Sequence, residues 1–366
     1  MMLALTQARI FTGKDMITGE AILLDNGRIL GLVSENSIPS DYYIIHHPGM
    51  TIVPGLLDLQ IYGGGGVLFS DAPSSAALYQ MAAGLLKSGT TGFLITLATN
   101  RLEVFEAAMD IVHDNPHPAV LGLHLEGPYI NPVKRGAHIL DCIRKPALKE
   151  VEALLKRAKG TVKMMTLAPE LASPDVIQLL LDNGVVISAG HSNATFAEGM
   201  AGFNAGIQTA THLFNAMSPF HHRDVGLPGA VYQSHAFASI IPDGIHVSYE
   251  TLAISKKVMG ERLFLITDAV EKSEGAYPHI RQQDRFALPD GTLSGSAISL
   301  VEGVRNCVQH AGLTFEEAVR MATVYPAKLM GYTDIGAIRS GYRANFTLID
   351  ADGNAGGVYI DGQFHQ

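Results

Sequence analysis

Short, mostly apolar runs recur along the middle of the chain, and most are separated by stretches with a helical pattern of apolar positions. The runs are TIVPGLLDL, TGFLITLA, AVLGLHL, VKMMTLA, GVVISA, IQTAT, FASII and RLFLIT. The intervening segments 74–89 and 173–184 predict helices, and the second begins with Ser-Pro and closes with Asn-Gly. Strands that alternate with helices in this way predict an α/β fold, a (β/α)8 TIM-like barrel whose catalytic groups lie where the strands end.

The two ends of the chain have a different pattern. Residues 1–50 contain short alternating strands with turn signals such as LDNGR, and residues 336–366 repeat this character. We therefore expect one small β domain built from residues 1–50 plus 336–366, with a barrel of residues 51–335 inserted between its two parts.

Composition narrows the class of protein. Of the 366 residues, 47% are hydrophobic and 17% charged, which predicts a large core and no disordered segment. A net charge of −9 argues against nucleic acid as a partner but leaves room for a phosphate-bearing metabolite. With two cysteines, no basic leader and no run of about 18 apolar residues, we expect reduced thiols, a cytoplasmic location and no membrane partner.

Polar residues stand just past four of the apolar runs. They are Glu126, His191, His212 and Asp268, and they should converge at the mouth of the barrel. Two imidazoles and one carboxylate can hold a catalytic metal with one position open for water. Such an ion lowers the pKa of its water from about 15.7 to near 7, and Asp268 could then take and return a proton.

The first strand lacks the usual metal ligands. In many metal-dependent hydrolases it ends in His-x-His, whereas PGLLDLQIYGGGG has Gln60 and Tyr62 at those positions. We therefore expect one divalent ion per subunit. Two histidines and one carboxylate favour zinc, with Fe2+ or another first-row metal as the alternative. Gln60 is expected to hydrogen-bond the catalytic water or a metal ligand. Tyr62 could either close the empty second site or contact substrate.

Several segments together resemble the N-acetylglucosamine-6-phosphate deacetylase family of the amidohydrolase superfamily. They are GLHLEGPYINPVKRGAH, TLAPE, ISAGHSNATF, ATHLFNAM, PDGIHV, LITDA, LSGSAISLVEGVRN and MATVYPAKLMG. The resemblance spans nearly the whole chain and implies a barrel with a small β-sandwich. The loop between Asp268 and LSGS diverges from the family pattern, which bears on sugar selectivity.

The resemblance also implies a role for each matching residue. Glu126, His191 and His212 would be the metal ligands, Asp268 the general acid and base, and His138 the group that polarises the substrate carbonyl. Substrate-binding positions would be Ala137, Asn215, Ala216, Arg223 and His246. Arg223 would reach the phosphate in a neighbouring subunit, which implies a homodimer.

The expected reaction is removal of acetate from N-acetylglucosamine 6-phosphate. Deacetylation of N-acetylgalactosamine 6-phosphate is the first alternative. Another amidohydrolase reaction, such as deamination or cyclic-amide opening, is less favoured, because the fourth strand ends at Ala168 without the lysine that cyclic-amide hydrolases commonly use. A non-catalytic scaffold is disfavoured because the strand-end residues are retained. Epimer preference, metal identity and the role of Tyr62 stay open at this point.

Overall fold

The computed structural model describes residues 2–275 and 278–366. Its main sheet is parallel, in the order β17-β16-β15-β14-β13-β12-β11-β8. These strands are β8 (Leu56–Ile61), β11 (Thr90–Ala98), β12 (Val120–Glu126), β13 (Val162–Leu167), β14 (Val186–Ala189), β15 (Thr209–Ala210), β16 (Phe237–Ile240) and β17 (Leu263–Leu265). Every predicted apolar run overlaps one of them, so the predicted barrel fold is confirmed.

The barrel closes through the residues that follow β17. Ile61 and Ala269 form a parallel bridge. The backbone N–H of Asp268 donates to the carbonyl of Gln60 at 3.0 Å, and that of Tyr62 donates to Ala269 at 2.9 Å. This closure places the end of the first barrel strand beside Asp268, about 200 residues later in the chain.

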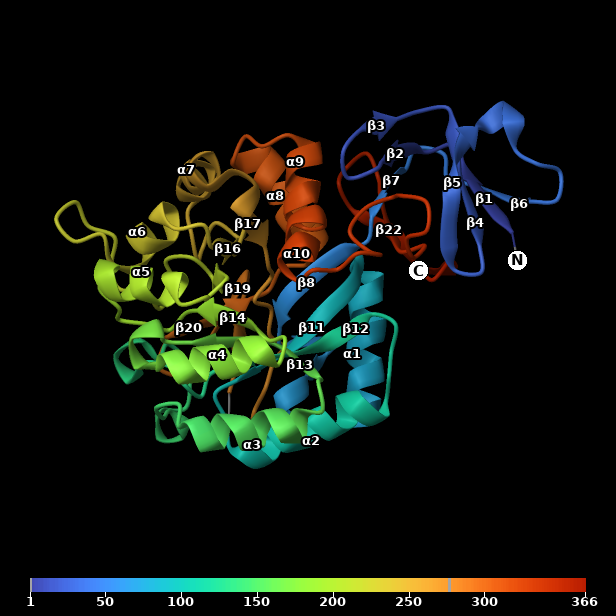
Figure 1. Cartoon of the computed structure of the whole chain (residues 1–366). Coiled ribbons are helices and arrows are strands. Elements are labelled where there is room, and N and C mark those ends of the chain that lie inside the picture. Colours follow the sequence, from blue (N-terminus) through green and yellow to red (C-terminus); the bar gives the residue numbers. More distant parts are fainter. Residues whose placement is uncertain (1, 276–277) are drawn as a thin grey trace.

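The helices surround the sheet, as Figure 1 shows. They are α1 (Ser75–Lys87), α2 (Leu102–Asp114), α3 (Leu148–Ala158), α4 (Pro174–Asp182), α5 (Phe196–Asn204), α6 (Gly226–Gln233), α7 (Tyr249–Met259), α8 (Leu300–His310), α9 (Phe315–Met321) and α10 (Val324–Leu329). Ser74 caps α1 by accepting from the N–H of Ala77, and Ser173 caps α4 in the same way. Both helices predicted from the sequence are therefore present.

Both chain ends lie in a separate β domain, drawn in blue and red in Figure 1. One sheet has the order β5-β4-β1-β6 and the other β23-β22-β21-β7-β2-β3. The strands are β1 (Leu3–Thr6), β2 (Arg9–Phe11), β3 (Met16–Ile17), β4 (Glu20–Asp25), β5 (Arg28–Ser34), β6 (Tyr43–His46), β7 (Thr51–Pro54), β21 (Phe346–Ile349), β22 (Ala355–Ile360) and β23 (Gln363–His365).

The first apolar run, residues 51–59, is divided between the two domains. Its beginning is β7, which pairs with β2 and β21 of the terminal domain, and its end enters barrel strand β8. Gly55 stands at the break, where a Cβ atom would lie 2.0 Å from the hydroxyl oxygen of Thr91. The close approach of the neighbouring strand therefore requires glycine here.

Shorter strands lie outside these sheets. β9 (Gly63–Gly64) pairs with β10 (Val67–Leu68), and β18 (Ile280–Gln282), β19 (Arg285–Ala287) and β20 (Leu293–Ser296) form an antiparallel sheet. The second group lies in the loop between Asp268 and the LSGS segment and in LSGS itself. Within the described part of the chain, no helix has both the length and the apolar character to span a bilayer.

Candidate active site

A pocket lies at the C-terminal ends of the barrel strands, where barrel enzymes carry their catalytic groups. It is lined by most of the residues predicted from the sequence, namely Tyr62, Glu126, Ala137, His138, His191, His212, Asn215, Ala216, His246 and Asp268. Gln60 is buried next to it, 2% exposed. The fold therefore brings together side chains that are up to 208 residues apart in sequence.

Three of these side chains form a candidate metal centre. Glu126 ends β12, and His191 and His212 follow β14 and β15, with one ligand atom of each lying within 4.8 Å of the others. Oε1 of Glu126 is 3.1 Å from Nε2 of His212 and 3.3 Å from Nε2 of His191. Two imidazoles and one carboxylate that converge in this way fit a divalent ion with an open position.

The protonation of the histidines agrees with a ligand role. Nδ1 of His191 lies 2.9 Å from the carbonyl of Lys134, which can only accept, so Nδ1 carries the proton and Nε2 presents its lone pair to the centre. Burial lowers the pKa of His212, which favours a neutral ring. Its Nδ1 is buried and has no partner among the described residues.

Glu126 receives hydrogen bonds from the first strand. Nε2 of Gln60 donates to its Oε1 at 2.9 Å, and the hydroxyl of Tyr62 donates to its Oε2 at 2.5 Å. Although burial opposes ionisation, His191 and His138 hold the pKa of Glu126 well below its usual range. Glu126 is therefore a carboxylate in this site.

His138 is held in one tautomer. The backbone N–H of Thr99 donates to its Nδ1 at 3.1 Å, so the proton lies on Nε2, which is 2.9 Å from Oε2 of Glu126. Burial, followed by the neighbouring His191, lowers the pKa of His138 to about 4. The ring is thus a neutral donor aimed at the centre of the pocket, which suits stabilisation of a developing oxyanion.

The residues at three strand ends have unusual backbone conformations. The φ angles of His191, His212 and Asp268 are +46°, +33° and +55°. These values lie in the left-handed region, which residues other than glycine rarely adopt. Backbone strain of this kind is common where side chains must point into a site. Here it occurs at two of the candidate ligands and at the candidate acid–base group.

Asp268 faces the candidate ligands. Its Oδ1 accepts from Nε2 of Gln60 at 2.7 Å. Burial, and after it the charge of Glu126, raises the pKa of Asp268 well above its usual value. A carboxyl with a raised pKa can hold and release a proton nearer neutrality, as a general acid–base group requires.

The outer part of the pocket is polar but contains little positive charge. Nδ1 of His246 lies 2.6 Å from Oδ2 of Asp243, which leaves Nε2 for a ligand. Asn215 and Ala216 form the turn after His212, and the φ of Ala216 is +50°. Within the described residues, no lysine or arginine lines this pocket.

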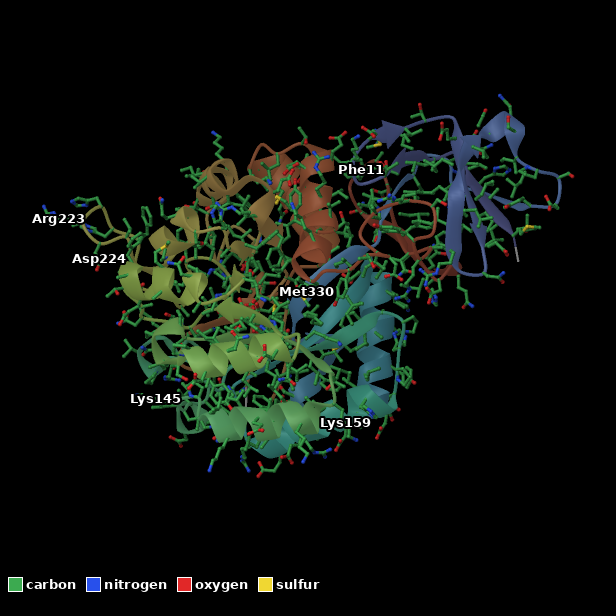
Figure 2. All side chains as sticks on the ribbon, viewed as in Figure 1. Phe11, Lys145, Lys159, Arg223, Asp224 and Met330 are labelled. Atoms are coloured by element: carbon green, nitrogen blue, oxygen red, sulfur yellow. The ribbon has the colours of Figure 1, made fainter. Side chains whose placement is uncertain are left out.

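Arg223 is the predicted substrate contact that the fold does not bring to the pocket of its own chain. It lies in a tight turn bridged by His221 and Asp224 and is exposed. Figure 2 shows Arg223 and Asp224 at the tip of a loop that projects from the barrel. Its guanidinium is free to reach beyond the surface of this chain.

Some pocket residues were not predicted individually from the sequence. Leu68, Ser70, Val270, His279 and Ser294 also line it, and Nδ1 of His279 is 2.9 Å from the hydroxyl of Ser294. Ser294 lies in the LSGS segment, and His279 lies in the divergent loop before it. The expected divergence of this loop was the only sequence feature that pointed to His279. No local pattern in the sequence shows that its side chain turns toward the pocket.

Comparison with known proteins agrees with the fold and with the expected family. Residues 51–364 match the model of the Amidohydrolase family, and residues 2–45 match the NagA composite domain. The chain is 31% identical to N-acetylglucosamine-6-phosphate deacetylase of Haemophilus influenzae over 100% of both chains. It is 32% identical to N-acetylgalactosamine-6-phosphate deacetylase of a Shewanella species, over 99% of this chain and 95% of that protein.

Solved structures extend the likeness to the three-dimensional arrangement. The crystal structure of N-acetylglucosamine-6-phosphate deacetylase from Pasteurella multocida superposes with a TM-score of 0.95 at 33% identity, covering 100% of both chains. The corresponding enzyme from Mycobacterium smegmatis gives a TM-score of 0.89 at 28% identity, also over 100% of both chains.

Proposed function

The chain belongs to the amidohydrolase family, and we propose that it hydrolyses N-acetylglucosamine 6-phosphate to acetate and glucosamine 6-phosphate. One observation carries the proposal: Glu126, His191, His212 and Asp268 converge in a pocket of a chain that matches named deacetylases along its full length. A protein that had become a non-catalytic scaffold would have no need to keep these four residues together, so their convergence favours an enzyme.

In the proposal, Glu126, His191 and His212 hold one divalent ion, zinc as first choice and Fe2+ or another first-row metal as the alternative. When bound, such an ion polarises the amide carbonyl and lowers the pKa of water to about 7. Metal binding needs neutral imidazoles and an ionised carboxylate. The lowered pKa values of His212 and Glu126 and the contact of Nδ1 of His191 with the Lys134 carbonyl support these states.

The remaining steps belong to the side chains of the protein. Asp268 takes the proton of the attacking water and delivers it to the amide nitrogen, so that the C–N bond breaks and the amine leaves neutral. Nε2–H of His138 donates to the carbonyl oxygen as negative charge develops there. The raised pKa of Asp268 supports the first role, and the Thr99 contact to Nδ1 of His138 supports the second.

We further propose a homodimer in which Arg223 holds the phosphate in the pocket of the neighbouring subunit. The lack of a lysine or arginine along the pocket within the described residues, and the projecting position of Arg223, support this arrangement. Ala137, Asn215, Ala216 and His246 would complete the contacts with the sugar phosphate. The same proposal places the enzyme in the cytoplasm, where Cys142 and Cys307 remain free thiols.

The test is acetate release from metal-loaded protein with three substrates: the 6-phosphates of N-acetylglucosamine and N-acetylgalactosamine, and unphosphorylated N-acetylglucosamine. We expect the highest kcat/KM for the gluco 6-phosphate and a large loss without phosphate. Preference for the galacto epimer would overturn the sugar assignment and leave the mechanism standing. Absence of acetate from every substrate would overturn the function.

Deacetylation of N-acetylgalactosamine 6-phosphate is the second candidate. The Shewanella relative named for that reaction is as similar to this chain as the Haemophilus relative is, at 32% against 31% identity. Part of the pocket wall, including Val270 and His279, comes from the segment between Asp268 and LSGS. In this proposal, sugar selectivity depends on that segment.

A further inference from the structure

The carboxylate of Glu126 has nearly all of its acceptor positions filled by protein donors. A carboxylate offers about four lone-pair sites, two on each oxygen. Oε2 accepts the O–H of Tyr62 at 2.5 Å and the Nε2–H of His138 at 2.9 Å. Oε1 accepts from Nε2 of Gln60 at 2.9 Å. The remaining site, on Oε1, lies 3.1 Å from Nε2 of His212.

That remaining site faces the candidate metal position. Oε1, and not Oε2, is the oxygen within 3.1 to 3.3 Å of Nε2 of His212 and His191. Glu126 can thus give a single oxygen to a cation held by the two histidines. Without substrate, Oε2 accepts two hydrogen bonds and has no lone pair for a second cation. The bond from Tyr62 is the one that stays in place when His138 donates to substrate.

The amide of Gln60 can lie only one way round. Its Nε2 is 2.8 Å from Oη of Tyr62 and 2.7 Å from Oδ1 of Asp268, in addition to its contact with Glu126. Turning the amide over would place a carbonyl oxygen against Oε1 of Glu126, which is ionised and can only accept. Gln60 therefore donates, and its two N–H groups are shared among the three acceptors. The hydroxyl of Tyr62 donates to Oε2 of Glu126, because a carboxylate oxygen can only accept.

The ring of Tyr62 is fixed by packing. It is 9% exposed and clusters with Leu68, Val270 and Phe286. Its hydroxyl lies 2.5 Å from Oε2 of Glu126, and because a carboxylate oxygen can only accept, the hydroxyl keeps its proton and donates it. A buried ring and a protonated hydroxyl make a permanent donor to Oε2.

We propose that Tyr62, together with Gln60, is a positioning residue that restricts Glu126 to one ligand oxygen and limits the centre to a single divalent ion. The inference rests on the proposed function, in which Glu126, His191 and His212 hold that ion. The first strand has therefore replaced metal ligands with hydrogen-bond donors that act on the metal through Glu126.

The experiment compares Tyr62→Phe with Tyr325→Phe. Both remove the hydroxyl of a buried tyrosine that donates to a glutamate, because Oη of Tyr325 is 2.9 Å from Oε1 of Glu317, outside the pocket. Metal affinity is measured without substrate, by competition for zinc with a chelator. Outer hydrogen-bond partners of metal ligands typically contribute about 10- to 100-fold in affinity, so we expect a loss of that size for Tyr62→Phe and none for Tyr325→Phe.

Wild-type affinity in folded Tyr62→Phe would overturn the proposal, as would two tightly bound equivalents in the wild-type protein. If Tyr62→Phe does not fold, Gln60→Met provides the measurement, since it keeps the side-chain length and removes the donor to Oε1. Unchanged affinity in that variant would also overturn the proposal. A protein that binds no divalent ion would instead refute the function on which the inference rests.

Discussion

Replacing Asp268 with asparagine tests the acid–base role most directly. Asparagine has the same shape, and its Oδ1 can still accept from Nε2 of Gln60, which is 2.7 Å from the carboxyl oxygen in the structure. The amide cannot take a proton from water and return it to the leaving nitrogen. General acid–base groups contribute about 10²- to 10⁴-fold in rate, or roughly 2.7–5.4 kcal/mol at about 1.36 kcal/mol per decade. We therefore expect kcat to fall by at least about 10²-fold.

The assay is steady-state acetate release by metal-loaded Asp268→Asn, with metal content measured on the same sample. Asp268 lies outside the converging ligand set, so the variant should keep its metal. Asp334→Asn is the matched control, because Asp334 is paired with Arg28 and lies outside the pocket. A variant that retained half of the wild-type kcat with its metal bound would refute the role of Asp268.

The same substitution has a predicted effect on stability. Burial and the charge of Glu126 raise the pKa of Asp268, whereas an unfolded aspartate titrates near about 3.9. Its contribution to stability is therefore fully present below about pH 3.9 and is lost as the pH rises through the higher folded pKa. In chelator at neutral pH, Asp268→Asn should unfold at a higher temperature than the wild type, and a lower Tm would contradict the assigned shift.

The remaining predictions concern the phosphate, the carbonyl and the metal. Arg223→Ala should raise KM by about one to two decades, since a charge-assisted hydrogen bond contributes roughly 1.5–3 kcal/mol, with a smaller effect on kcat. Mixing the Arg223→Ala protein with the Asp268→Asn protein should restore partial activity in hybrid dimers. No recovery in verified heterodimers would exclude a phosphate site shared between subunits. His138→Ala should lower kcat by about 10²- to 10³-fold at nearly unchanged metal content, and a change in KM alone would argue against oxyanion stabilisation. Chelation should abolish activity, and one equivalent of zinc per chain should restore it; a requirement for two equivalents would refute a one-metal centre.

The strand ends were predictable because the signal is local. Each apolar run marks a strand, and the residue after the run falls at the rim of a parallel barrel whatever its neighbours are. Glu126, His191, His212 and Asp268 could be named on that basis, and the structure brings all four into one pocket. Their roles in catalysis stay predictions until the variants are measured.

Other features depended on contacts that sequence periodicity does not encode. The run 51–59 is mostly apolar along its length, yet pairing with β2 and β21 draws its first half into the terminal domain. Lys134 fixes the tautomer of His191 through a backbone carbonyl, which carries no sequence signature. His279 turns into the pocket because its loop folds into a small sheet against LSGS.

The sequence by itself determined the barrel, its terminal β domain, which residues stand at the strand ends and the absence of histidines from the first strand, because all of these follow from residue type and local order. Only the tertiary structure decided what replaced those histidines. Gln60 and Tyr62 reach Glu126 across 66 and 64 residues, and Gln60 reaches Asp268 across 208. Closure of the barrel sets these contacts. The distance between two side chains that are remote in sequence, and whether they point toward each other, are fixed only when the strands pair.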